Sequence, residues 1–204
     1  MNKADLSPHL SEWRDRWAVG VSHTLSPAGV ATLVLAAMAL RSPDGAPVPL
    51  WGALVGIAVY ALVPAAVLLV LARRSGAADV FDPSKAVRRR MLLAGTICYL
   101  MGYGVIEIVG LGSGMRWVGA TFAAGAAAVW AIDRGWKISI HNTGAGGGAV
   151  LLLELSPELW PFWGLLPLVV GWARWQRGAH DLAQLAAGAA LGGGLAWFLR
   201  GYYQ

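Results

Sequence analysis

Two histidines that follow closely spaced basic residues are the side chains of this sequence best suited to chemistry. His180 ends the run ARWQRGAH and His141 ends the run KISIH, while a third basic run, KAVRRR, begins at Lys85. Only 13% of the residues are charged, and ionisable groups at membrane depth cost free energy unless they serve a function. Cations grouped with histidines are suited to bind a phosphate and to react with it.

These residue types divide the work of phosphoryl chemistry between them. Lysine and arginine supply positive charge and donors for phosphate oxygens, and arginine can bind two oxygens at once. Of two histidines, one can act as a nucleophile and the other as a proton donor near neutral pH. The sequence has no paired carboxylates and no cysteine cluster. We therefore expect neither a metal nor any other cofactor, and expect the cations to stabilise the developing charge.

The composition places the chain in a membrane. Of 204 residues, 57% are hydrophobic, and the mean hydropathy is +0.56, whereas soluble domains are about 45–50% apolar. The net charge of +5 comes without basic low-complexity tracts, so nucleic acid is not an expected partner. The single cysteine, Cys98, excludes an intramolecular disulfide.

Seven apolar stretches approach the roughly 20 residues that a membrane-spanning helix requires. They cover residues 24–41, 50–72, 91–112, 115–132, 142–156, 159–173 and 182–199. Two of them are short and broken by prolines, so we expect an all-α integral membrane protein with six transmembrane helices, or seven. The runs are continuous rather than alternating, which excludes a membrane β-barrel.

A polar segment with an amphipathic pattern precedes the first apolar stretch. Apolar residues recur there at helical spacing, at Leu6, Leu10, Trp13 and Trp17. Ser7-Pro8 is typical of a helix start, and the pattern predicts a helix over 8–17 that lies in the membrane interface. A frayed tail is the alternative. We therefore divide the chain into an interfacial segment, 1–20, and a transmembrane domain, 21–204.

Two glycine-rich patches fall within predicted helices. They lie at 144–148 and 192–194. Small residues let membrane helices approach closely, which is the interpretation that we prefer for both. For 144–148, close approach of the backbone to a ligand is an alternative, because this patch follows His141 by three residues.

The three basic runs are expected to lie on one side of the membrane. Two predicted spans separate Lys85 from His141, and two more separate His141 from His180, so the chain returns each time to the same face. The loops at 73–90, 133–141 and 173–181 also hold most of the lysines and arginines. Because such residues favour the cytoplasmic side, we expect a cytoplasmic site in a protein of the inner membrane.

One motif resembles a known family. Arg174 is followed after five residues by His180, and then by the small-residue stretch 184–192. This is similar to the third motif of the type 2 phosphatidic acid phosphatases (PAP2), relatives of the vanadium haloperoxidases, in which Ser-Arg precedes His and then Asp. Here Ala173 stands at the Ser position and Gln184 at the Asp position.

The other two motifs of that family have weaker counterparts. Ser139-Ile140-His141 matches Ser-Gly-His with isoleucine at the glycine position, and Lys85-Ala86-Val87-Arg88 matches the Lys/Arg motif without its usual proline. The order of the motifs agrees over residues 73–192. The resemblance therefore implies a PAP2-like helical bundle over most of the chain.

The resemblance also implies roles for individual residues. His180 would be the nucleophile that forms a phosphohistidine, His141 the general acid for the leaving oxygen, and Gln184 the group that orients His180. The residues that would bind phosphate are Lys85, Arg88, Lys137, Ser139 and Arg174. Gln184 brings no charge, unlike the usual Asp, and Asp181 would be the partner of His180 if the register differed.

The function implied is that of a metal-independent lipid phosphatase. Its substrate would be a phosphate monoester or diphosphate of a membrane lipid, such as a phosphatidate-like lipid or a polyprenyl (di)phosphate. The alternative is a catalytically weakened PAP2-fold protein that binds or transports such a lipid. Vanadate-dependent oxidation, as in the related haloperoxidases, fits poorly with a chain this short and apolar. The sequence leaves the lipid and the oligomeric state open.

Overall fold

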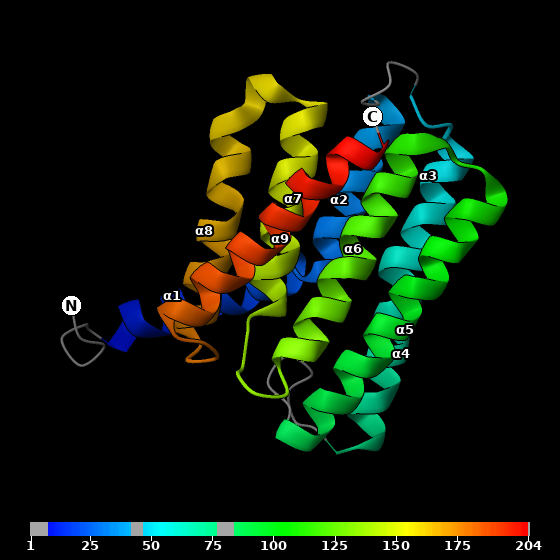
Figure 1. The fold of residues 1–204 in the computed structure, drawn as a ribbon. Coiled ribbons are helices and arrows are strands. Elements are labelled where there is room, and N and C mark those ends of the chain that lie inside the picture. Colours follow the sequence, from blue (N-terminus) through cyan, green and yellow to red (C-terminus); the bar gives the residue numbers. More distant parts are fainter. Residues whose placement is uncertain (1–7, 42–46, 77–83, 204) are drawn as a thin grey trace.

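The computed structural model describes residues 8–41, 47–76 and 84–203, and these form helices without a β-strand (Figure 1). Leu6 and Ser7, which were part of the predicted amphipathic pattern, lie outside the described residues. The α-helices are α1 Pro8–Thr24, α2 Pro27–Leu40, α3 Leu50–Ile57, α4 Val63–Arg74, α5 Lys85–Val109, α6 Gly112–Ile132, α7 Ile140–Leu155, α8 Trp160–Gln176 and α9 Leu182–Tyr203. A π-helical stretch, Ala58–Leu62, joins α3 to α4, and a short 3-10 helix, Pro157–Leu159, precedes α8.

Four helical segments of the described chain are long and apolar enough to cross a membrane. They are Leu50–Arg74, Lys85–Val109, Gly112–Ile132 and Leu182–Gly201. The pair α1 and α2, bent by 56°, supplies a fifth if it counts as one span. These apolar helices agree with the expected all-α membrane protein. The expected number of six or seven transmembrane helices stays a prediction. Helices α7 and α8 have 16 and 17 residues, or about 24–26 Å, which is less than the hydrocarbon thickness of about 30 Å.

Helix α1 extends further than the sequence pattern indicated. It continues from Pro8 to Thr24 rather than ending near residue 17, and Trp13 and Trp17 on it are exposed. Its polar side contacts the end of α8, where Gln176 donates to Asp15 Oδ1 at 2.8 Å. This segment is therefore helical and docked onto the bundle.

The turns at the site end of the bundle are set by a few local signals. Ser139 begins α7 as its N-cap, accepting a hydrogen bond from the backbone N–H of Asn142 at 3.3 Å. After α8, Gly178 adopts a left-handed conformation with φ of 65°, and Ala179 N–H donates to the Arg174 carbonyl at 3.0 Å. The reversal brings His180 back toward Arg174.

Helices α7 and α9 cross with their backbones in close approach, and glycines make this possible. A Cβ on Gly192 would overlap the Thr143 carbonyl, and one on Gly146 would overlap the Ala189 carbonyl. A Cβ on Gly188 would lie 2.6 Å from the Ser139 carbonyl oxygen. Gly146 and Gly192, one from each predicted glycine patch, thus serve close helix packing at this crossing.

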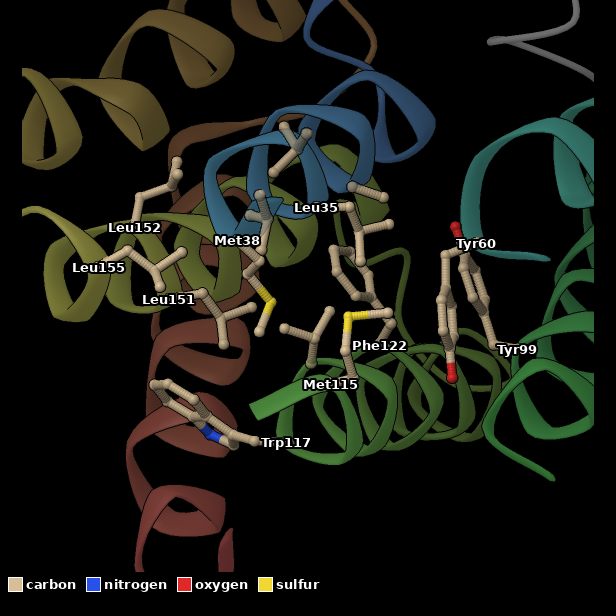
Figure 2. Close-up of a cluster of buried hydrophobic side chains, with 14 of the residues drawn as sticks. Leu35, Met38, Tyr60, Tyr99, Met115, Trp117, Phe122, Leu151, Leu152 and Leu155 are labelled. Carbon is tan, nitrogen blue, oxygen red and sulfur yellow. The ribbon is translucent and has the colours of Figure 1, made fainter. Parts of the chain in front are cut away.

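An apolar core fills the bundle where α2, α6 and α7 run together. Figure 2 shows its side chains, among them Leu35 and Met38 of α2 facing Met115 of α6 and Leu151 of α7. The Trp117 indole donates to the Ala196 carbonyl at 2.8 Å and so ties α6 to α9. Because the first four of these residues come from the later part of α2, the start of α6 and the later part of α7, they lie away from His141 at the start of α7.

Substitution of Gly192 by alanine should destabilise the protein, because the added methyl group meets a backbone carbonyl that cannot rotate away. Overpacking of this kind costs about 1–3 kcal/mol, and each kcal/mol corresponds to about 2–4 °C in the unfolding temperature of a chain this size. Gly194→Ala is the matched control, since nothing lies within 4 Å of its Cβ position. Thermal unfolding in detergent should separate the two variants, and equal unfolding temperatures would refute the close crossing.

Candidate functional site

The starts of α5, α7 and α9 and the ends of α6 and α8 lie toward one end of the bundle, the lower side of Figure 1. A cavity of about 670 Å³ opens there, lined by residues of α1, α2 and α4 to α8. Five of its lining residues are basic or imidazole groups: His23, Arg88, His141, Arg174 and Arg177. The fold therefore brings together residues that are up to 154 positions apart in the sequence.

Arg88 is held rigidly by a buried acid that the sequence analysis missed. Its Nε donates to Asp133 Oδ1 at 2.8 Å, and its Nη2 donates to the Ile138 carbonyl at 2.8 Å. The side chains of Arg88 and Asp133 are only 11% and 4% exposed. Because Ile138 directly precedes Ser139, these bonds fix the guanidinium beside the segment that leads to His141.

His180 is oriented by Gln184. His180 Nδ1 and Gln184 Oε1 are 2.9 Å apart, and since a carboxamide oxygen only accepts, the ring donates from Nδ1. The lone pair is then on Nε2, on the other side of the ring. Asp181 has a different task, because its Oδ1 accepts from the backbone N–H of Gln184 at 2.8 Å and caps the start of α9. Gln184, and not Asp181, contacts the imidazole.

Ser139 and Asn142 lock the start of α7 onto α8 and α9. The Ser139 N–H donates to the Gln184 carbonyl at 3.4 Å, so the segments carrying the two histidines are directly bonded. Asn142 donates to the carbonyls of Leu185 and Pro167 at 3.1 and 3.3 Å. The Ser139 hydroxyl accepts a capping bond and can still donate its own proton to a bound oxygen.

The surroundings of His180 keep its imidazole neutral at pH 7. Burial has the largest effect, and together with the positive charges of Arg88, Arg174 and Lys137 it lowers the pKa of His180 to about 4. The hydrogen bond to Gln184 acts in the opposite direction, because it stabilises the charged ring. A neutral ring leaves Nε2 able to act as a nucleophile.

The second histidine lies within the same group of charges. His141 is 4% exposed and interacts electrostatically with Arg174, His180, Arg177 and Arg88. Arg174 is 1% exposed and, like Arg88, acts on both imidazoles. A doubly charged anion between the two rings would face both guanidinium groups.

The structure brings most of the sequence-predicted residues together, with one exception. The residues gathered at this end are Arg88, Lys137, Ser139, His141, Arg174, His180 and Gln184. Lys85 is exposed at the start of α5 and is not among the described residues that line the cavity. Arg177 lines the cavity although the sequence analysis gave it no role, and its position one helical turn after Arg174 was the available signal.

Comparison with known proteins adds no identification, because no family model, no curated protein and no solved structure matches the chain. The resemblance to PAP2 phosphatases therefore depends on the sequence motifs and stays a prediction. Among the described residues, no group of three or more His, Cys, Asp or Glu side chains is placed to hold a metal ion. The positive charges that act on the two histidines are those of Arg88, Lys137, Arg174 and Arg177.

Gln184→Asp should raise the pKa of His180, because a carboxylate beside Nδ1 stabilises the imidazolium. Gln184→Ala should lower it, since the bond that favours the charged ring is lost. NMR titration of the His180 ring follows both changes without depending on catalysis. Asp181→Asn is the control, because it keeps a side-chain acceptor for the helix cap. It should leave the pKa of His180 unchanged. A larger shift in Asp181→Asn than in the Gln184 variants would make Asp181 the partner.

Proposed function

We propose that this protein is a metal-independent membrane phosphatase of the PAP2 type. It hydrolyses the phosphate monoester or diphosphate of a lipid through a phosphohistidine at His180. The observation that carries the proposal is that the cationic group lines a largely apolar cavity between helices that include ones apolar enough to cross a membrane. A lipid phosphate presents the same combination of a dianionic head and an apolar tail.

The walls of the cavity support a lipid substrate. Away from the basic residues they are formed by apolar side chains of α4 and α5: Pro64, Ala65, Leu68, Leu69, Met91, Leu92 and Tyr99. Val19 and Pro27, on either side of the bend between α1 and α2, contribute another wall. A hydrocarbon chain can lie against these surfaces while the phosphate reaches His141, so the lipid need not leave the bilayer.

The chemistry follows from the two imidazoles. His180 Nε2 attacks phosphorus while Gln184 holds Nδ1–H. His141, which takes up a proton when the dianionic phosphate binds beside it, gives this proton to the leaving oxygen, so that the lipid departs and a phosphohistidine remains. Water then cleaves the N–P bond and restores His180. Arg88, Arg174, Lys137 and the Ser139 hydroxyl stabilise the charge on the phosphoryl oxygens throughout.

Two further features belong to the same proposal. The short hairpin α7–α8 completes a PAP2-like bundle of six transmembrane helices with the spans described above. The protein lies in the inner membrane with this end toward the cytoplasm. The reason is the excess of lysine and arginine at the site end, which includes Arg73, Arg74, Arg89, Arg90 and Arg134.

A second candidate is a protein of this fold that binds or transports a lipid phosphate without hydrolysing it. The neutral carboxamide of Gln184 favours this candidate. During hydrolysis the ring of His180 acquires positive charge, and an amide stabilises that charge less than a carboxylate does. The binding surface would be unchanged, and only turnover would be lost. Measurement of phosphate release therefore separates the two candidates.

The purified protein in detergent should release phosphate from phosphatidate or a polyprenyl (di)phosphate in the presence of EDTA. Vanadate, which mimics five-coordinate phosphorus, should inhibit. His180→Ala should abolish turnover and His141→Ala should lower it by about 10²–10⁴-fold, the usual contribution of general acid catalysis. His9→Ala, in the first turn of α1, is the histidine control and should retain activity.

Loss of activity on chelation, with recovery on adding a divalent metal, would contradict the mechanism. Full activity of His180→Ala would show that the reaction does not pass through a phosphohistidine at His180. Binding of these lipids without any phosphate release would leave the non-hydrolytic candidate in its place.

A further inference from the structure

The cations are distributed unequally between the two histidines. Arg88 and Arg174 act on both imidazoles, whereas Arg177 acts on His141 and Lys137 acts on His180. In the proposed reaction, His180 receives the phosphoryl group and His141 faces the leaving group. Arg177 is therefore an additional positive charge on the leaving-group side.

The cavity shows the same asymmetry. Its lining includes His141 and Arg177, but among the described residues it does not include His180 or Lys137. Arg177 caps the end of α8 one turn after Arg174, so that both guanidinium groups border the cavity from one helix. The rest of the lining is mostly apolar. A lipid entering the cavity has its tail on the Arg177 side and its terminal phosphate toward His180.

On the basis of the proposed phosphatase activity, we propose that Arg177 binds the lipid-linked phosphate of a lipid diphosphate. The terminal phosphate then lies between the two histidines, and Arg88 and Arg174 bind its oxygens. Arg177 becomes the residue that gives the site its preference for a diphosphate over a monophosphate with the same tail.

The reaction balances with this placement. The bond from the terminal phosphorus to the bridging oxygen breaks, and a bond from that phosphorus to His180 Nε2 forms. The bridging oxygen keeps the electron pair and receives a proton from His141, which gives a lipid monophosphate. Water hydrolyses the phosphohistidine and releases inorganic phosphate. No oxidant, metal or further reactant is required.

The charge of the leaving group explains why Arg177 matters for one substrate only. The lipid monophosphate that leaves from a diphosphate keeps a negative charge on its non-bridging oxygens even after His141 protonates the bridging oxygen, and Arg177 can bind that charge. The alcohol that leaves from a monophosphate is neutral once it has the proton from His141. A charge-assisted hydrogen bond contributes about 1.5–3 kcal/mol, which corresponds to about 10–150-fold in rate.

The experiment compares farnesyl diphosphate with farnesyl monophosphate in detergent, because the two differ only in the additional phosphate. The wild-type protein should have the higher kcat/KM for the diphosphate and should release inorganic phosphate from it, not pyrophosphate. Arg177→Gln should lower kcat/KM for the diphosphate by about 10–150-fold, while the monophosphate changes by less than about threefold. Arg177→Lys should recover part of the loss, because it restores the charge.

Arg73→Gln is the matched control, since Arg73 is an exposed arginine at the end of α4. Retained monophosphate turnover in Arg177→Gln shows that this variant is folded. Equal losses on both substrates, or pyrophosphate as the product, would overturn the role of Arg177. If the wild-type protein hydrolyses both compounds without a preference for the diphosphate, the role of Arg177 is refuted but the proposed phosphatase activity is not. If it hydrolyses neither compound, both proposals are refuted.

Discussion

The close crossing of α7 and α9 is the contact on which the rest of this structure depends. Gly146 and Gly192 allow the two backbones to touch at positions where any side chain would overlap a carbonyl. The start of α7 carries Ser139 and His141, and the segment entering α9 carries His180. The distance between the helices therefore sets the distance between the imidazoles, and the bond from the Ser139 N–H to the Gln184 carbonyl closes the arrangement.

Burial of positive charge is the second constraint. Arg174 and Arg88 lie almost out of contact with solvent, where an uncompensated charge is costly. Asp133 offsets part of this charge through its ion pair with Arg88. Burial and the remaining positive charge together keep His180 neutral, and the positive charge favours any anion that enters the cavity. In the proposed reaction the same charges prepare the nucleophile and attract the phosphate, which links the stability of the site to its proposed substrate.

The sequence predicted the features that follow from local pattern or from chain direction. The position of Gln184 beside His180 and the return of the basic runs to one end depend on a short spacing and on the antiparallel order of helices. Arg177 could have been found from its spacing of one helical turn after Arg174, but Asp133 could not. Asp133 meets Arg88 across 45 positions, and only the packing of α5 against the loop after α6 brings them together. The exposure of Lys85 and the length of α1 likewise depend on tertiary packing.

Covalent trapping of the phosphorylated intermediate tests the central claim most directly. A lipid phosphate labelled with ³²P at the reacting phosphorus would be mixed with the purified protein, quenched within the first turnover and analysed by peptide mapping. The account predicts label on the peptide that contains His180, formed and lost at the rate of phosphate release. Turnover with no labelled protein, or with label on a different residue, would contradict it.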